Sequence, residues 1–387
     1  MARVVIGANY GDEGKGLATD WAVRLAEGSK LVVRFNGGSQ AGHTAETPEG
    51  QRHIFSHFSS GSFAKADTYL GRNFICNPIT FKMERERMSK VGLDPIVIVN
   101  PQCRVTTYLD MMANQLIEAS RTKRHGSCGL GIFETFLRHR DKIQFTIEND
   151  PPPFDVLMDY FIERLRTAAP EMIAFADKQG YTSRRHYVQW LEDYQLFLRK
   201  VQVFAMKPGR YENVVFEGAQ GLLLDMDYVD GAPHLTPSNT GLYGTVQDMQ
   251  ELGVDSVDVF YVTRSYLTRH GAGPLVGEVK FTLPDQTNMP NEFQGTLRFA
   301  PLDPMDLVGR ISNDRARFQA AMPSTEVRTH LMVTHTNSLH EFTDDPATWY
   351  DRLQNAAEAI QAETWSSNDK THRSVTCGIP ILAGTQR

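Results

Sequence analysis

Short apolar runs along the chain alternate with stretches in which apolar residues recur every three to four positions. Continuous runs of this length are typical of buried parallel strands, and the three-to-four spacing is typical of amphipathic helices. The runs predicted as strands are RVVIGA (3–8), KLVVRF (30–35), DPIVIV (94–99), ENVVFEG (212–218), VDVFYVT (257–263) and THLMVTHT (329–336). Helical patterns between them include LDMMANQLIEAS (109–120) and YGTVQDMQELGV (243–254). The alternation predicts an α/β fold with a largely parallel twisted sheet flanked by helices.

One long stretch interrupts the alternation of strands and helices. From about 150 to 205 the pattern is helical and rich in aromatic residues, and the prolines of NDPPPFD punctuate its start. We interpret it as a helical insertion in a single domain that covers residues 1–387. The short tail TCGIPILAGTQR (376–387) is expected to line a site or to close the sheet.

Composition excludes several classes of protein. The chain has 387 residues, of which 41% are hydrophobic and 22% charged, and its net charge is −6. This balance argues against a general nucleic-acid or membrane-surface binder, which tends to be basic. No signal-peptide pattern or long apolar run appears, so a cytoplasmic location is expected. The four cysteines are scattered without a CxxC pair, so neither a zinc site nor a disulfide framework is expected.

Candidate chemistry is concentrated in five polar, glycine-bearing stretches, expected at or near the carboxyl ends of strands. That edge is where ligands bind in open α/β sheets. Glycine at a strand-to-helix turn is often only a backbone necessity, but five such stretches with Asp, His, Gln, Ser and Arg side chains indicate a nucleotide or phosphorylated-substrate site. They are GANYGDEGKG (7–16), FNGGSQAGHT (35–44), HGSCGLGIFET (125–135), FEGAQGLLLDMD (216–227) and TRHGAGP (268–274).

The first stretch is typical of a phosphate-binding loop with two unusual features. Glycines at 11, 14 and 16 allow backbone N–H groups to approach phosphate oxygens, and Lys15 adds positive charge. Gly16 stands where such loops usually have Ser or Thr, and Asp12 and Glu13 bring negative charge. A carboxylate there repels phosphate unless it binds Mg²⁺ or takes a proton from a substrate. The alternative, that the acids favour a helix start through its dipole, is stronger for Glu13 than for Asp12.

The second stretch places a histidine in a flexible polar frame. His43 follows GGSQAG, where Ser39 and Gln40 supply further polar groups. A lone histidine is more often structural than catalytic, but this combination favours a functional role.

These motifs resemble the adenylosuccinate synthetase family. The resemblance is carried, in the family's order, by YGDEGKG (10–16), NGGSQAGHT (36–44), FEGAQGLLLDMD, SNT (238–240), TRHGAGP and NEF (291–293). Members phosphorylate the 6-oxygen of a purine monophosphate, and aspartate then displaces the phosphate. The resemblance implies a carbon–nitrogen ligase that needs Mg²⁺ and acts as a homodimer.

The resemblance also implies roles for individual residues. Asp12 would take the N1 proton of the purine and bind Mg²⁺ together with the Gly42 carbonyl, and His43 would stabilise the oxyanion and the transferring phosphoryl group. The phosphate donor would be held by Gly11, Gly14, Lys15, Gly16 and Asn337. The acceptor nucleotide would be held by Gln40, Ser127, Cys128, Gln220, Thr236 and Arg140, with Arg138 as a second candidate for an arginine lent to the partner subunit. Thr296 and Arg298 would bind the substrate aspartate.

Three departures from the family pattern bear on substrate choice. The arginine-rich aspartate loop after NEF is shortened and leaves Arg298 as the obvious cation. Cys128 replaces a hydroxyl in the phosphate grip, and Leu130 replaces a usual arginine. In VTHTNS (333–338), Asn337 stands where the family has an aspartate that accepts two N–H bonds from guanine. An amide offers one acceptor and one donor group, so it suits adenine, and ATP or dATP becomes the expected donor. The alternative is that Asn337 is only a turn residue.

A known branch of the family combines such features, namely the phage enzymes of the 2-aminoadenine pathway. They join aspartate to dGMP with ATP and form N6-succino-2-amino-2'-deoxyadenylate. The chain resembles this branch more than the housekeeping enzyme, although members of the branch can lack the aspartate that is retained here as Asp12. Two alternatives stay open: a synthetase that acts on IMP with GTP or ATP, and a nucleotide-binding switch protein without ligase activity.

Overall fold

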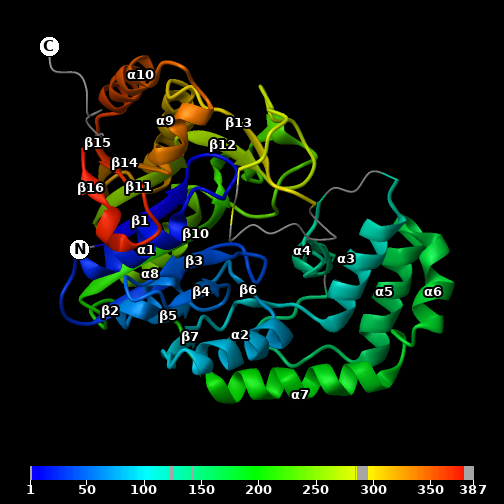
Figure 1. The fold of residues 1–387 in the computed structure, drawn as a ribbon. Helices are drawn as coiled ribbons and strands as arrows, with labels where there is room; N and C mark the ends of the chain where they lie inside the picture. Colours follow the sequence, from blue (N-terminus) through cyan, green and yellow to red (C-terminus); the bar gives the residue numbers. More distant parts are fainter. Residues whose placement is uncertain (1, 123–125, 142, 284, 286–294, 379–387) are drawn as a thin grey trace, which may run out of the picture.

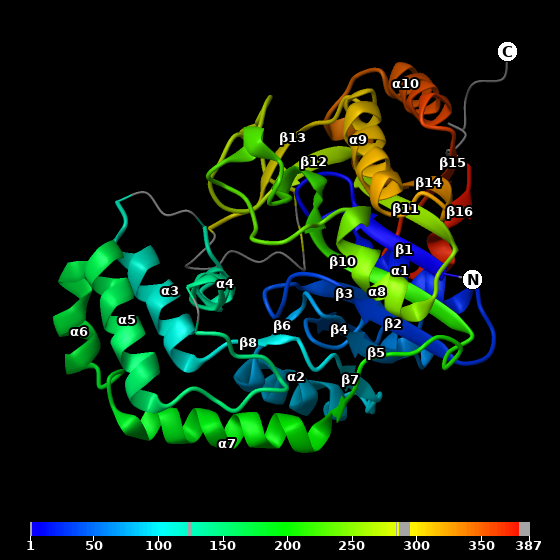
Figure 2. The ribbon, with the colours of Figure 1, turned by 180° about the vertical axis from the view of Figure 1, so that it is seen from behind.

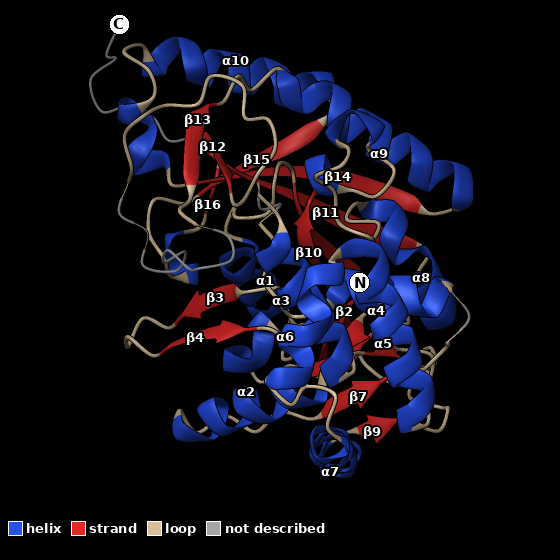
Figure 3. Ribbon diagram, turned by 90° about the vertical axis from the view of Figure 1, so that its right-hand side faces the viewer, coloured by secondary structure: helices blue, strands red, loops and turns tan. Residues whose placement is uncertain are grey.

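A ten-stranded sheet forms the centre of the molecule (Figures 1 and 3). The computed structural model describes residues 2–122, 126–141, 143–283, 285 and 295–378. All neighbouring strands are parallel except the last pair, β15 and β16. In spatial order they are β16 (Thr376–Cys377), β15 (Ala362–Ser366), β14 (Glu326–Thr334), β11 (Ser256–Arg264), β1 (Ala2–Gly7), β10 (Asn213–Gly221), β2 (Lys30–Arg34), β5 (Asp67–Leu70), β7 (Val97–Val99) and β9 (Gln202–Val203).

Three two-stranded pairs lie outside the main sheet, and helices cover both of its faces. The pairs are β3 (His43–Glu46) with β4 (Arg52–Phe55), β6 (Ile75–Cys76) with β8 (Arg104–Val105), and β12 (Tyr266–Arg269) with β13 (Arg298–Pro301). The α-helices are α1 (Lys15–Arg24), α2 (Pro78–Lys90), α3 (Tyr108–Ser120), α4 (Ile132–Arg140), α5 (Phe154–Ala168), α6 (Ile173–Lys178), α7 (Arg184–Lys200), α8 (Val246–Leu252), α9 (Asp306–Ala321) and α10 (Pro346–Ala359).

Side chains on the two faces of the central strands belong to separate apolar clusters, because successive side chains along a strand point to opposite faces of the sheet. On one face Val4 and Ile6 of β1 pack with α8, α9 and α10. On the other face Val5 packs with α1 through residues such as Trp21. Because both faces are covered, the central strands are apolar along their whole length, which is why the sequence predicts them well.

The insertion predicted at about 150–205 consists of α5, α6 and α7, and these helices lie beside α3 and α4 at one end of the molecule (Figures 1 and 2). A further apolar cluster joins this end to the sheet, since it contains Phe161 and Trp190 of the helices together with Val97 and Val99 of β7. The parallel sheet and its flanking helices confirm the predicted fold class. The single-domain assignment stays a prediction.

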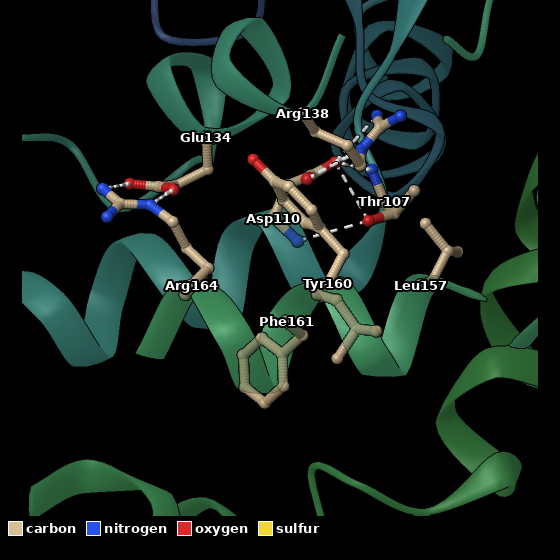
Figure 4. Close-up of a pocket in the computed structure, with 10 residues that line it drawn as sticks. Thr107, Asp110, Glu134, Arg138, Leu157, Tyr160, Phe161 and Arg164 are labelled. Carbon is tan, nitrogen blue, oxygen red and sulfur yellow. Dashed lines mark hydrogen bonds and ion pairs between the residues drawn. The ribbon is translucent and has the colours of Figure 1, made fainter. Parts of the chain in front are cut away.

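A small cavity of about 10 Å³ lies among α3, α4 and α5 (Figure 4). Arg138 fills one side of it and donates to both carboxylate oxygens of Asp110, and Arg164 donates to Glu134 (2.7 and 3.1 Å). A volume of this size holds about one water molecule. These ion pairs therefore fasten the helices to one another and do not form a ligand site.

Three features of the fold bear on the sequence-based expectations. Strands β5, β9, β15 and β16 were not predicted, because their segments (DTYL, QV, AETWS and TC) mix polar with apolar residues and form no continuous apolar run. The stretch 125–135 does not follow a strand: its described part, 126–135, comes after α3 and leads into α4. The tail, as far as residue 378, closes the sheet, since β16 pairs with β15 at its edge.

Candidate active site

The glycine-bearing stretches touch one another in pairs, the first with the fourth and the third with the fifth. A Cβ on Gly11 would lie 2.9 Å from the Cα of Gln220, so the first and fourth stretches touch. The third and fifth also touch, since a Cβ on Gly126 would lie 2.5 Å from the Cα of Gly271. Backbone packs directly on backbone at these points, which is why glycine is needed there.

The phosphate loop connects β1 to α1 and ends in a left-handed glycine. Gly14 caps α1 with φ 97°, and Lys15 at the first helical position is buried. The Lys15 ammonium donates to the Gly11 carbonyl. The structure also explains why Gly16 replaces the usual Ser or Thr: a Cβ there would lie 2.2 Å from the Thr44 carbonyl oxygen. The helix packs so closely on β3 that a side chain has no room.

Glu13 is folded back into this loop. Its Oε1 accepts the N–H groups of Asn9 (3.0 Å) and Gly11 (2.7 Å), and its Oε2 lies 3.2 Å from the Lys15 ammonium. The helix begins only at Lys15 and has no acidic residue in its first turn. The alternative that Glu13 favours the helix start is therefore wrong, because its carboxylate binds loop donors instead.

Asp12 stands at the tip of the same loop. Its side chain is 25% exposed, and its Oδ2 lies 3.8 Å from His270 Nε2 of the 268–274 stretch, beyond direct hydrogen-bond distance. Arg264 at the end of β11 donates to the Asp12 carbonyl and fixes the backbone there. The carboxylate is therefore held at the surface of the site, where a ligand can reach it.

His43 begins β3 and is fixed by a carboxylate that sequence reasoning did not single out. Glu217 in β10 accepts from His43 Nδ1 (2.7 Å) and from Ser60, and Arg34 lies 3.7 Å away. These partners lower the pKa of Glu217 to about 2 despite its burial. Burial lowers the pKa of His43 to about 4, so the imidazole is neutral near pH 7. An ionised carboxylate that orients a neutral imidazole is a common catalytic arrangement.

Two glutamines present unsatisfied polar atoms in the same region. Among the described residues, both side-chain atoms of Gln40 and the Oε1 of Gln220 are buried without a hydrogen-bond partner, and so are Ser39 Oγ and Thr44 Oγ1. Gln220 also has a left-handed backbone, with φ 63°. Buried polar groups are normally paired, so this cluster marks a place where a polar ligand can supply the missing hydrogen-bond partners.

The residues predicted to hold the acceptor nucleotide are spread over three segments. Ser127 Oγ donates to Asn114 (2.8 Å), and burial raises the pKa of the neighbouring Cys128 to about 11, which keeps the thiol neutral. Thr236 is buried and donates its N–H to Leu224. Arg140 is exposed and pairs with Asp141 (2.9 Å). Their roles stay predictions.

Of the two arginines proposed to serve the partner subunit, Arg138 is ruled out by its environment. It is buried and is occupied by Asp110 and by the carbonyls of Val105 and Ile143.

The predicted aspartate-binding residues lie at the start of β13. Thr296 is exposed. The Arg298 guanidinium donates to both oxygens of Glu278 (2.9 and 2.5 Å) and to the carbonyls of Gly271 and Gly273 (3.0 and 2.9 Å). A substrate carboxylate would therefore have to replace Glu278. The NEF motif lies outside the described residues.

The predicted base-reading residue is accessible. Asn337 is exposed, two residues beyond His335, which follows β14 and has a left-handed φ of 54°. Burial, with Arg264 nearby, lowers the pKa of His335 to about 3, so its imidazole is neutral near pH 7.

A magnesium ion fits this site only with help from a substrate. No three His, Cys, Asp or Glu side chains in the described ranges are placed to hold a metal. Mg²⁺ is commonly held by one or two carboxylates plus substrate phosphates, and the partly exposed Asp12 beside the phosphate loop provides one carboxylate. No helix in the part of the chain that the structure describes is long and apolar enough to cross a membrane.

At the carboxyl edge of the parallel sheet, β1 leads through a glycine loop into α1, which begins with the buried Lys15. This arrangement is typical of nucleotide-binding α/β proteins related to the phosphate-loop fold. The family model for adenylosuccinate synthetase matches residues 4–298. The chain therefore belongs to the adenylosuccinate synthetase family. Relatives with that name include proteins of Francisella philomiragia, 32% identical over 292 residues, and Clostridium beijerinckii, 30% identical over 294 residues. These matches cover 71% and 72% of this chain but only 65% and 66% of the relatives.

Two solved structures share the fold over nearly the whole chain. Fully ligated adenylosuccinate synthetase from Plasmodium falciparum superposes with a TM-score of 0.64 at 14% identity, over 97% of this chain and 99% of that one. Succinoaminodeoxyadenylate synthetase (PurZ) of cyanophage S-2L, bound to dGMP and dATP, superposes with a TM-score of 0.60 at 14% identity, over 97% and 95%.

Proposed function

We propose that this protein is a carbon–nitrogen ligase that condenses L-aspartate with dGMP at the expense of ATP. The products are N6-succino-2-amino-2'-deoxyadenylate, ADP and phosphate. The observation that carries the proposal is the position of Asp12, a partly exposed carboxylate at the tip of the phosphate loop. From there it would lie beside phosphates bound by the loop and within reach of a purine ring edge.

In the proposed reaction, each of the site residues has a separate role. Asp12 accepts the N1 proton, which turns the 6-oxygen of the purine into a nucleophile toward the terminal phosphorus of ATP. Lys15 and the loop N–H groups hold the phosphates, and His43, oriented by Glu217, faces the charge that develops during transfer. The aspartate amine then attacks C6, and the phosphate leaves. When bound, Mg²⁺ neutralises phosphate charge, and Asp12 with the Gly42 carbonyl would hold it.

The choice of ATP rests on Asn337. An exposed amide at the end of β14 pairs donor to acceptor with adenine, and it cannot accept both guanine N–H bonds. Cys128 and Leu130, which depart from the family pattern where the acceptor nucleotide is expected to bind, support dGMP. The fold shared with PurZ, a protein solved with dGMP and dATP, is consistent with both choices.

A second candidate is an adenylosuccinate synthetase that acts on IMP. The retained Asp12 and the 32% identity to a relative of that name favour it. Both purines carry N1–H beside a 6-oxo group, so the same base serves either substrate.

The two candidates separate in one assay. We expect phosphate release with aspartate, Mg²⁺, ATP and dGMP, and little release when IMP replaces dGMP. Turnover of IMP without turnover of dGMP would establish the second candidate. A protein that binds nucleotide but releases no phosphate with either purine would be a switch protein and not a ligase.

A further inference from the structure

The carboxylate of Glu13 occupies the point where the anion-binding groups of the phosphate loop converge. It accepts the N–H groups of Asn9 and Gly11 through one oxygen and meets the Lys15 ammonium through the other. Backbone N–H groups and a lysine are the partners that such a loop offers to phosphate. The carboxylate therefore stands in the place of a ligand oxygen.

The fit around Glu13 leaves no room for both anions. The side chains of Glu13 and Lys15 are 3% and 1% exposed. A Cβ on Gly7 would lie only 2.4 Å from Glu13 Oε2, so the carboxylate is packed against the last residue of β1. A phosphate oxygen reaches the N–H of Gly11 only after the carboxylate has moved, and two anions at this spacing repel each other.

The backbone of Glu13 is anchored independently of its side chain, so the side chain can rotate out of the loop while the backbone stays in place. Thr334 Oγ1 at the end of β14 donates to the Glu13 carbonyl (2.7 Å), which anchors the main chain. A second cation, Arg310 of α9, donates to Asn9 Oδ1 beside the carboxylate. After the side chain rotates away, Lys15 and Arg310 both face the loop, and its charge balance then favours a polyanion.

We propose that Glu13 is an internal competitor of the phosphate donor: its carboxylate holds the anion position of the empty loop and is displaced by the phosphates of the nucleotide. This inference rests on the proposed function, because it assumes that the loop binds a nucleoside triphosphate. A polyphosphate with several charges displaces the carboxylate, whereas a single inorganic phosphate competes poorly. Glu13 thus sets donor affinity and selects polyphosphates over the phosphate that the reaction releases.

The test is the binding of Mg²⁺–ATP by calorimetry, without aspartate or acceptor nucleotide. Glu13→Gln keeps the size of the side chain and removes its charge, so the competitor is weakened. If the carboxylate occupies the loop about nine-tenths of the time, the variant binds ATP roughly tenfold more tightly, and tightening of about threefold or more supports the proposal. Glu171→Gln, an exposed acid in the distant helical end, removes the same charge and is expected to leave affinity unchanged.

Equal or weaker binding by Glu13→Gln would overturn the proposal, because it would mean that the carboxylate supports the loop. Calorimetry of Glu13→Ala is a second, independent measurement, and this variant is also expected to bind ATP more tightly than the wild type. Should a variant fail to fold in a thermal melt, a crystal structure of the wild-type protein with ATP decides: Glu13 Oε1 is expected beyond hydrogen-bond distance of Gly11 N, and retention of that bond overturns the proposal. Failure of the wild type to bind either ATP or GTP would instead refute the proposed function, and this inference with it.

Discussion

At the scale of single residues, Asp12 bears the largest share of the proposed chemistry. Replacement of Asp12 by Asn or Ala removes the base, so we expect phosphate release to fall about 10²- to 10⁴-fold while the fold is kept. Steady-state phosphate release with dGMP and with IMP measures this effect. Asp159→Ala, an exposed acid on α5, serves as the control. Substantial remaining activity in Asp12→Ala would place the base elsewhere.

Asn337 gives a second prediction at this scale. Asn337→Asp supplies two acceptor oxygens for guanine, so the ratio of kcat/KM for GTP to that for ATP should rise roughly tenfold or more, as expected for one or two added hydrogen bonds. Asn337→Ala is the matched control and should weaken both donors without a change of preference. An unaltered preference for ATP in the Asp variant would refute the assignment of Asn337 to the base pocket.

Prediction of single site residues from the sequence succeeded where glycine motifs mark the loops. It failed for residues whose role depends on burial in the folded protein. The loops with Asp12, His43 and Gln220 do adjoin one another, as expected for ends of neighbouring parallel strands. Glu217 was missed, although a carboxylate in the middle of a buried apolar strand was a signal in itself, since charged side chains are almost never fully buried without partners. The position of the Glu13 carboxylate could not be predicted, because it depends on a loop conformation and not on a pattern.

At the scale of elements, the close contact of α1 with β3 restricts which residue can stand at position 16, at the end of the phosphate loop. Gly16→Ser restores the usual residue of such loops, but its Cβ would collide with the Thr44 carbonyl. We expect a loss of about 1–3 kcal/mol in the free energy of unfolding, the usual cost of overpacking, together with weaker nucleotide binding. Chemical denaturation measures the first and calorimetry the second.

Gly309 in α9 is the matched control for this prediction. A Cβ there has no neighbour within 4 Å, so Gly309→Ser should leave stability nearly unchanged. A Gly16→Ser protein as stable and as active as the wild type would show that α1 and β3 separate more easily than their packing implies.

A comparison of the predicted with the observed strands shows which structural predictions the sequence supports. The six predicted strands were all confirmed, because strands buried on both faces are continuous apolar runs. Strands β5, β9, β15 and β16 were not predicted, and the stretch after α3 was wrongly expected to follow a strand, since the positions of these segments are set by tertiary packing. The glycines of 126–131 resemble a strand-to-helix turn in sequence, but here they connect two helices.

At the scale of the whole molecule, one buried carboxylate links stability to pH. Asp248 of α8 lies under Gly71, and burial raises its pKa to about 8. The folded protein therefore binds a proton that the unfolded chain releases near pH 4, and the corresponding stability is lost as the pH rises toward 8. We expect the wild-type melting temperature to fall between pH 5 and pH 8 for this reason.

Asp248→Asn imitates the protonated acid and isolates this contribution. The variant should match the wild type only at about pH 4 or below, be more stable by about 1.4 kcal/mol already at pH 5, and melt several degrees higher at pH 8, given about 1.4 kcal/mol for each pKa unit. Differential scanning calorimetry over this range measures the difference, with Asp159→Asn as an exposed control. A constant offset at all pH values would show that the carboxyl group is ionised in the folded protein.

The order of strands also has a consequence for synthesis of the chain. β1 lies between β10 and β11, whose residues begin at Asn213 and Ser256. On a ribosome adding 5–20 residues per second, the apolar first strand waits roughly 10–40 s before its first neighbour exists. The phosphate loop closes later still, when Thr334 reaches the Glu13 carbonyl. In a nascent chain of this protein the apolar strand β1 thus lacks a neighbouring strand for more than half of the synthesis, and the nucleotide site assembles only after Thr334 has been added.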